Sequence, residues 1–137
     1  MIHEVKVQYR KMDDDGNERV HKEWYAIENQ ASFTEVEARF IKAFDYDNYK
    51  DFEVTDIKRS KVRELANTRE LNADKVFMAE VKDIFLKDDG TEKDIKYKIL
   101  FFAGNFDKAK DFICEYLEQG YNMTLITLKE TKFIDVL

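Results

Sequence analysis

The N-terminal segment alternates between apolar and polar side chains, with Val5, Val7 and Tyr9 separated by charged or amide residues. A period of two predicts a β-strand that buries one face. The dipeptide Asp15-Gly16 follows, and it favours a tight hairpin because glycine adopts the positive φ that such turns need. We therefore expect a β-hairpin at the start of the chain.

A second hairpin is predicted around Asp89-Gly90. The strand that returns from this turn alternates from Ile95 to Ala103, but Leu100 and Phe102 make its end apolar on both faces. A strand with two apolar faces is typical of burial on both sides. We expect Leu100 and Phe102 to be covered by the rest of the chain or by a partner.

A helix and a closing strand are expected after each hairpin. Ser32 and Glu35 have the spacing of a capping box, and Asn105 has the same place before the second helix. Closing strands are predicted over 52–63 and 122–134. Apolar residues at helical spacing form one stripe on each helix. The stripes are Phe33, Val36, Phe40, Ala43 and Phe44, then Phe106, Ala109, Ile113, Tyr116 and Leu117.

The chain therefore contains an internal repeat. Three blocks recur in the same order, 4–18 with 80–92, 32–36 with 105–109, and 52–62 with 123–133, the first copy of the first block being two residues longer. We predict an α+β fold in which two tandem ββαβ repeats are related by a pseudo-twofold, with the helices packed on mainly antiparallel sheet.

We expect residues 1–137 to form a single domain, with repeat one at 1–65, a connection at 66–75 and repeat two at 76–137. A unit of about 60 residues buries only about 60% of the surface of its unfolded chain. The two repeats should therefore share a core.

The charge balance limits the classes of partner. The chain carries 23 Lys and Arg against 29 Asp and Glu, a net charge of −6, which disfavours a protein that coats nucleic acid or an anionic membrane. No segment has the roughly 18 apolar residues of a membrane helix, so we expect no membrane association. A single cysteine fits a reducing compartment, which predicts a cytoplasmic protein.

No catalytic, metal or cofactor site is predicted. A calcium loop around Gly16 would place Lys11 and Lys22 at its first and twelfth positions, where carboxylates are required. Cys114 is expected to be a small buried packing residue of the second helix. The two histidines, His3 and His21, are expected at the surface or at a sheet edge, where two imidazoles make a poor zinc site.

Two surface features are candidates for recognition. Lys58, Arg59, Lys61 and Arg63 form the one dense positive run, and the acidic loop 45–51 carries two tyrosines that offer apolar area with a polar tip. With the apolar end of the second hairpin, they define a candidate interaction surface. Its residues are Tyr46, Tyr49, Lys58, Arg59, Lys61, Leu100 and Phe102.

Four segments together resemble a known family. They are the strand Val5-Lys6-Val7 with Tyr9, the sequence SFTEVEAR at 32–39, VTDIKR at 54–59, and Asp135-Val136. The chain is similar to an uncharacterised family of small proteins, a domain of unknown function found in gut-bacterial genomes, phages and mobile elements. Val36 stands where the family usually has alanine. The resemblance implies the fold and a mobile-element setting, and it supplies no catalytic residues.

We expect a non-enzymatic protein-interaction or assembly module, encoded by a phage or mobile element, that associates with a protein partner or with itself. One alternative is an acidic inhibitor of a host or defence protein. Another is weak nucleic-acid binding through the Lys58–Arg63 strip, with Tyr46 or Tyr49 stacking on bases. An unrecognised enzyme would instead need a deep pocket that holds a perturbed carboxylate or Cys114.

Overall fold

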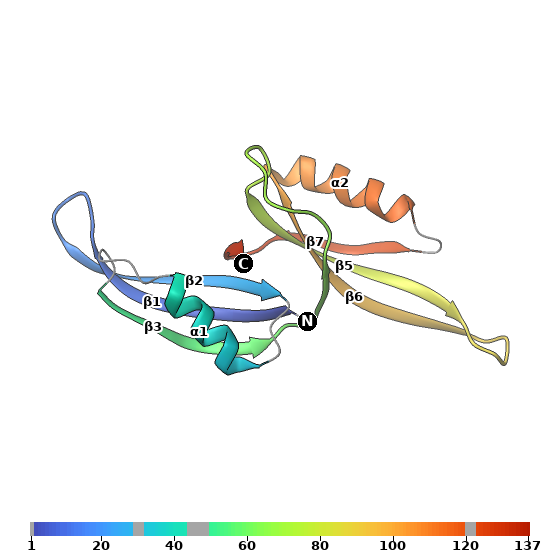
Figure 1. Ribbon diagram of the computed structural model, residues 1–137. Helices are drawn as coiled ribbons and strands as arrows, with labels where there is room; N and C mark the ends of the chain where they lie inside the picture. Colours follow the sequence, from blue (N-terminus) through green and yellow to red (C-terminus); the bar gives the residue numbers. More distant parts are fainter. Residues whose placement is uncertain (1, 29–31, 44–49, 120–122) are drawn as a thin grey trace. The chain divides into compact units, whose positions relative to one another are not determined.

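The computed structural model describes residues 2–28, 32–43, 50–119 and 123–137 (Figure 1). Within these residues the order ββαββ occurs twice. The first set is β1 (Ile2–Met12), β2 (Glu18–Glu28), α1 (Phe33–Ala43), β3 (Lys50–Arg59) and β4 (Val62–Leu65). The second set is β5 (Lys75–Leu86), β6 (Glu92–Ala103), α2 (Phe106–Glu118), β7 (Thr124–Glu130) and β8 (Phe133–Val136).

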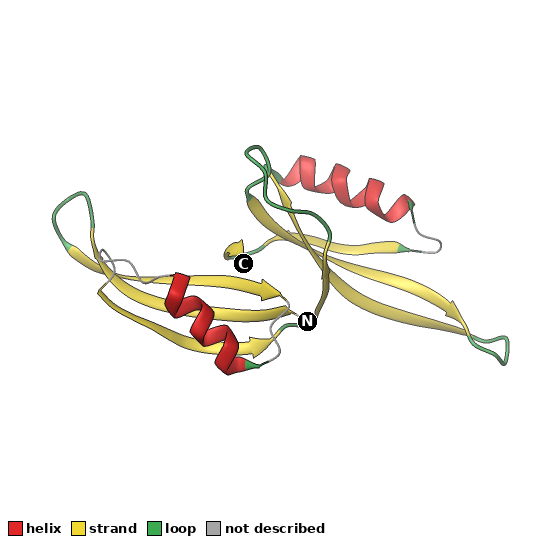
Figure 2. Ribbon diagram, in the orientation of Figure 1, coloured by secondary structure: helices red, strands yellow, loops and turns green. Residues whose placement is uncertain are grey.

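The chain divides into two compact units that do not follow the order of the sequence. Unit 1 comprises Met1–Ser60 and Lys132–Leu137, and unit 2 comprises Lys61–Thr131. Each unit contains one four-stranded sheet, with the order β3-β1-β2-β8 in unit 1 and β7-β5-β6-β4 in unit 2. Three strands of each sheet are antiparallel, and the short fourth strand is parallel to its neighbour. One helix packs on each sheet (Figure 2).

The predicted fold class is confirmed, because the structure is α+β, mainly antiparallel and ββαβ in each half. The pseudo-twofold and a core shared by the two repeats stay predictions. Each unit also contains a core of its own. The core of unit 1 is formed by Val5, Val7, Tyr25, Ile27, Val36 and Phe40. The core of unit 2 is formed by Phe77, Ala79, Val81, Tyr97, Ile99, Phe101, Ala103, Ala109, Ile113 and Leu117.

The prediction of two continuous closing strands was wrong. β3 ends at Arg59, and after Ser60 and Lys61 the chain continues as β4 in the sheet of unit 2. The second copy breaks in the same way after Glu130, so that β8 joins the sheet of unit 1. The two halves of the sequence thus exchange their last strands. Each break lies in a run of four polar residues, 58–61 and 129–132, that contains neither glycine nor proline, so the pattern alone could not show where the strand ends.

Matched hydrogen bonds hold the two breaks. The backbone N–H of Ser60 donates to the carbonyl of Ile2 over 2.8 Å, and the N–H of Thr131 donates to the carbonyl of Val76 over 2.9 Å. Each bond ties the end of an edge strand to the first strand of its own hairpin. The two copies therefore form the same hydrogen bond at corresponding residues, Ser60 with Ile2 and Thr131 with Val76.

The turns of the two hairpins are equal in length, which corrects the predicted alignment of Glu4 with Glu80. Gly16 and Gly90 have φ of 81° and 85°, and each turn contains five residues between its paired strands. When the two sequences are aligned on Gly16 and Gly90, the cross-strand pair Val5–Tyr25 corresponds to the cross-strand pair Ala79–Ile99. The alignment based on the shared Glu-Val-Lys sequence differs by two residues from the register that the strand pairing gives. In the correct register His3, Lys6 and Trp24 correspond to Phe77, Glu80 and Lys98.

The helices follow the predicted stripes at their centres. Val36 and Phe40 in α1 and Ala109, Ile113 and Leu117 in α2 are buried. At the N-terminal ends, Phe33 and Phe106 are half exposed, and Phe44 lies outside the described residues.

Both predicted helix caps are confirmed. The side-chain oxygen of Asn105 accepts from the N–H of Lys108 over 2.8 Å, and the hydroxyl of Ser32 accepts from the N–H of Glu35 over 3.3 Å.

The connection between the two copies begins as an extended segment and then turns at Leu71-Asn72, where Glu70 and Ala73 pair. The N–H of Ala66 donates to the carbonyl of Leu100 over 2.9 Å, which continues the pairing of β4 with β6. The side chain of Asn67 then imitates a backbone: its amide donates to the carbonyl of Phe102 over 2.9 Å and accepts from the N–H of Phe102 over 2.6 Å. In unit 1 the backbone of Leu137 makes the corresponding bonds, with Ala26 and Glu28.

Candidate interaction surfaces

Each unit extends beyond its core as a two-stranded β-hairpin. In unit 1, β3 pairs with β1 only as far as Arg10, so among the described residues no third strand pairs with 11–20. In unit 2, β7 pairs with β5 up to Lys82 and β4 pairs with β6 from Lys98, so no other described strand pairs with residues 83–97. We call these segments arm 1 (residues 11–20) and arm 2 (residues 83–97); their turns project from the two sheets in Figure 1.

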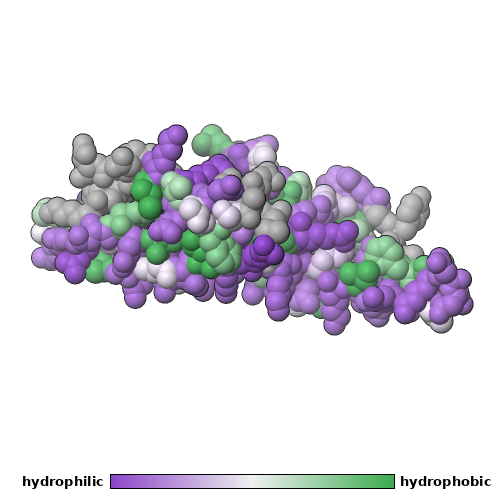
Figure 3. Space-filling model, turned by 60° about the horizontal axis from the view of Figure 1, so that its bottom comes forward, coloured by the Kyte–Doolittle hydropathy of each residue, from purple (hydrophilic) through white to green (hydrophobic). Residues whose placement is uncertain are grey.

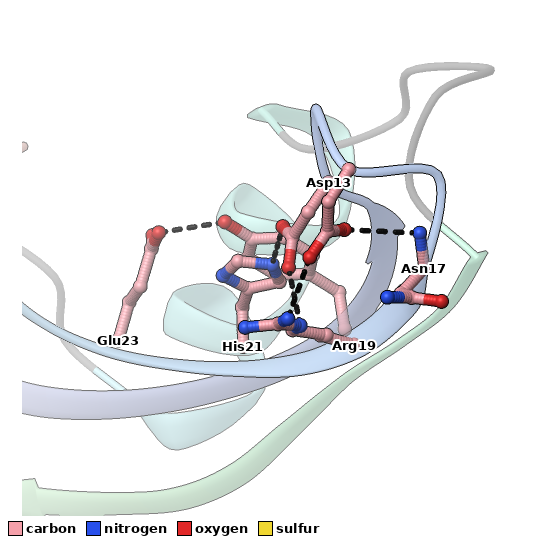
Figure 4. Close-up of polar contacts among 7 residues, drawn as sticks. Asp13, Asn17, Arg19, His21 and Glu23 are labelled. Atoms are coloured by element: carbon pink, nitrogen blue, oxygen red, sulfur yellow. Dashed lines mark hydrogen bonds and ion pairs between the residues drawn. The ribbon is translucent and has the colours of Figure 1, made fainter.

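Arm 1 is anchored by a polar network (Figure 4). Arg19 bridges Asp13 and Asp15, with nitrogen–oxygen distances of 3.0 and 2.7 Å. Asp15 also accepts from the backbone N–H of Asn17 over 3.0 Å, and Asp13 lies 3.2 Å from Nε2 of His21. Asp13, Asp15 and Arg19 are therefore engaged with one another.

The network continues from the turn into the core of unit 1. The ring of His21 stacks on that of Tyr9, with centroids 5.3 Å apart and planes at 11°. The hydroxyl of Tyr9 donates to Glu23 over 2.6 Å, and the buried Tyr25 donates to the other carboxylate oxygen. This chain of contacts fixes the direction of arm 1. Among the described residues no group of three metal-ligating side chains occurs, and we interpret the network as structural.

Arm 2 presents large apolar side chains to solvent. Leu86 is 76% exposed and Phe85 is 44% exposed, and they point to opposite faces of the strand because they are adjacent. Hydrophobic side chains are visible along this arm at the right of Figure 3. Arm 1 carries Met12 and Val20, which are 64% and 49% exposed. Both arms thus combine ordered backbone pairing with exposed apolar area.

The turn and the base of arm 2 are held by local contacts. Asp89 accepts from the hydroxyl and the N–H of Thr91, over 2.6 and 3.0 Å, and the hydroxyl bond is the main reason that its pKa is lowered. At the base, the guanidinium of Arg63 lies 4.6 Å from the ring centroid of Tyr97. Burial, followed by the charge of Asp83, raises the pKa of Tyr97. Lys82 pairs with Asp94 over 3.1 Å.

Unit 1 has a small pocket on one side of its sheet, beside the indole of Trp24. It has a volume of about 90 Å³. The ammonium groups of Lys132 and Lys6 lie 4.6 and 5.3 Å from the ring centroid of Trp24. The pocket is lined by Glu4, Val5, Lys6, Trp24, Asp56, Lys58, Lys132 and Phe133. Sequence reasoning missed this site, because Lys132 reaches Trp24 only through the parallel pairing of β8 with β2.

The candidate surface predicted from the sequence is divided by the fold. Lys58 and Arg59 lie on β3 in unit 1, whereas Lys61 and Arg63 belong to unit 2. Lys58 pairs with Glu4 over 3.3 Å and lines the Trp24 pocket. The predicted basic strip is therefore not one continuous strand edge.

The remaining predicted surface residues are placed differently. Leu100 and Phe102 are buried, with exposed fractions of 0% and 3%. Tyr46 and Tyr49 lie outside the described residues. An interaction through these four residues stays a prediction.

Two further expectations were wrong. Cys114 is exposed rather than buried, because it lies beside the apolar stripe of α2 and not on it. His3 is fully buried, since it follows the same alternation as Val5 and Val7 and faces the core. His3 pairs across the hairpin with Ile27 and His21 with Tyr9, so the two histidines are not cross-strand partners.

These features define the class of protein as an α+β repeat protein with two exchanged strands and two projecting hairpins. The chain belongs to a family described as Domain of unknown function (DUF4494), whose model matches residues 1–137. No curated protein and no solved structure matches the chain. Within the described part of the chain, neither helix has the length and apolarity needed to cross a bilayer.

Proposed function

We propose that this protein is a non-enzymatic protein-interaction or assembly module that holds a partner through its hairpin arms. The observation that carries the proposal is the exposure of Phe85 and Leu86 on arm 2, a hairpin that is paired down to its turn although no third strand from the described part of the chain supports it. Large apolar side chains that project on an ordered element are typical of contact surfaces, since each one leaves apolar area in water until a partner covers it.

The backbone of the arms supports the same function. A two-stranded hairpin is marginal in water, and its outer N–H and C=O groups can pair with another strand. In arm 2 the apolar side chains lie next to such open edges, so a partner could add a strand and bury Phe85 or Leu86 at the same time. Arm 1, fixed by its polar network, offers Met12 and Val20 in a corresponding position.

The proposal includes a setting. We propose that the module acts in the cytoplasm of a bacterial cell and is encoded by a phage or mobile element, as the family resemblance implies. The exposed free thiol of Cys114 supports a reducing compartment, because accessible thiols oxidise readily elsewhere. The partner is a protein or a second copy of this chain.

Site-specific photo-crosslinking tests the proposal. A photoreactive amino acid replaces Leu86 in the full chain, and the native cells are irradiated. A matched variant carries the same amino acid at Leu71, which is 96% exposed but lies in the connection. We expect a discrete crosslinked protein from position 86 that is absent from position 71, and mass spectrometry identifies it as this chain or another.

Light scattering on purified protein provides the second measurement. If the partner is a second copy, the mass rises with concentration, and Leu86→Lys lowers it to that of a monomer whereas Leu71→Lys does not. A concentration-independent monomer together with the same crosslinks from positions 86 and 71 would overturn the proposed function.

A further inference from the structure

The Trp24 pocket lies entirely within unit 1. Glu4, Lys6 and Trp24 belong to the same side of the sheet, because Glu4 and Lys6 alternate with the core residue Val5 and Lys6 pairs directly with Trp24. Trp24 lies on β2, which has β1 on one side and β8 on the other. Lys132 directly precedes β8 and lines the pocket on the β8 side, since Trp24 pairs with Phe133. Four separate segments of the chain thus converge on one indole.

The charges around the indole do not balance. Three ammonium groups line the pocket, and that of Lys58 is paired with Glu4 over 3.3 Å. The ammonium groups of Lys6 and Lys132 instead both lie over Trp24. Within the described segments neither forms an ion pair, although Asp56 is the cross-strand neighbour of Lys6. The positive charges of Lys6 and Lys132 repel each other beside the half-buried indole. The attraction of each ammonium group to the ring offsets this repulsion only in part.

The repeat provides an internal comparison. In unit 2 the positions of Lys6 and Trp24 are occupied by Glu80 and Lys98, which are direct cross-strand neighbours, and Lys61 has the place of Lys132. Unit 2 therefore has a carboxylate where unit 1 has a second ammonium group. Unit 1 in turn carries Glu4 and Asp56 where unit 2 has Met78 and Thr127. Glu4 is paired with Lys58, and within the described residues neither carboxylate forms an ion pair with Lys6 or Lys132.

We infer that the Trp24 pocket binds a small oxyanion, a carboxylate or a phosphate group, held by Lys6 and Lys132. A cavity of about 90 Å³ holds about three water volumes, which suits a group of this size. The indole and Phe133 reduce the access of water, which strengthens charge-assisted hydrogen bonds from the lysines.

The chain contains one tryptophan, so its fluorescence reports on this pocket alone. The full chain is titrated with inorganic phosphate and, separately, with acetate, with the ionic strength held constant by sodium chloride. The indole N–H signal of Trp24 in a nitrogen-15 NMR spectrum is a second readout that needs no change in emission. We expect saturable binding of at least one anion, and the two titrations distinguish a phosphate site from a carboxylate site.

Two variants locate the binding. Lys132→Met should weaken the apparent affinity about tenfold or more, as expected for a lost hydrogen bond between charged groups. Lys6→Glu copies unit 2 and should abolish saturation. Lys61→Met, the counterpart of Lys132 in the other unit, should change nothing. The inference fails if neither anion saturates either signal, or if Lys132→Met binds as the unmodified chain does. This result is independent of the arms and of the proposed function.

Discussion

The imidazole of His3 meets the ring of Phe33 edge to face, with centroids 5.6 Å apart and planes at 84°. His3 is fully buried, and neither ring nitrogen has a hydrogen-bond partner within the described residues. Burial, reinforced by the positive charge of Arg59, lowers the pKa of His3. The corresponding residue of the other copy is Phe77, which is also buried.

The first prediction is that His3 makes the fold sensitive to acid. Because its pKa is lower in the folded state, the unfolded state binds more protons as the pH falls below the ordinary histidine value of about 6.5. The free energy of unfolding should therefore decrease from that pH down to the lowered pKa. Urea unfolding of the full chain at a series of pH values measures this decrease.

His3→Phe, which copies Phe77, should remove that part of the pH dependence. It should also raise the free energy of unfolding at pH 7 by about 1 kcal/mol, since it removes unsatisfied buried polar groups. His21→Asn is the control and should keep the decrease due to His3. Equal pH profiles for His3→Phe and the unmodified chain would contradict the assignment.

The second prediction concerns Asn67. Asn67→Ala leaves the N–H and the carbonyl of the buried Phe102 without their partners, so the free energy of unfolding should fall by about 2 kcal/mol or more. Asn67→Asp keeps the acceptor for the N–H of Phe102 and should lose less. Hydrogen exchange at Phe102 checks the local cause, and unchanged protection in Asn67→Ala would show that the side chain is not needed there.

The third prediction concerns Gly104, where the backbone of Asn72 leaves no room for a side chain. A Cβ at this position would overlap the carbonyl oxygen of Asn72 in the connection. Gly104→Ala should therefore displace the backbone and lower the free energy of unfolding by about 1–3 kcal/mol. Gly90→Asn is the matched control, because its turn is open and asparagine tolerates positive φ. Thermal unfolding compares the two, and equal midpoints would argue against the close approach.

The fourth prediction separates local order from global stability. Arg19→Met removes both ion pairs in arm 1, but its side chain is 59% exposed. The free energy of unfolding should therefore change by less than about 1 kcal/mol. Amide exchange in arm 1 should nevertheless become faster, most clearly at low salt. Lys22→Met is the control on the same strand, and faster exchange there to the same extent would refute a specific role of Arg19.

Much of the fold was predictable because each element carries a local signal. Alternation and Asp-Gly turns indicated both hairpins, and Asn105 and Ser32 marked the helix starts through their capping chemistry. The exchange of β4 and β8 was not predictable, because the polar runs 58–61 and 129–132 contain no glycine or proline that would mark the end of a strand. The choice of sheet is made by tertiary contacts, which no local period encodes.

The surfaces were harder to predict than the fold. The basic run from Lys58 to Arg63 is dense in the sequence, yet the break after Ser60 sends its two ends to different units. The Trp24 pocket depends on Lys6 and Lys132, which are 126 positions apart in the numbering and meet only through sheet pairing. Cys114 shows the limit of helical periodicity, where one position around the helix separates a buried side chain from an exposed one.

The reciprocal transfer of β4 and β8 has a consequence for the origin of the chain. A lone ancestral copy would have been one strand short, and two such copies could have completed each other only as an obligate homodimer. Fragments 1–70 and 71–137, produced as separate polypeptides, should accordingly reassemble by complementation, each restoring the edge that the other lacks.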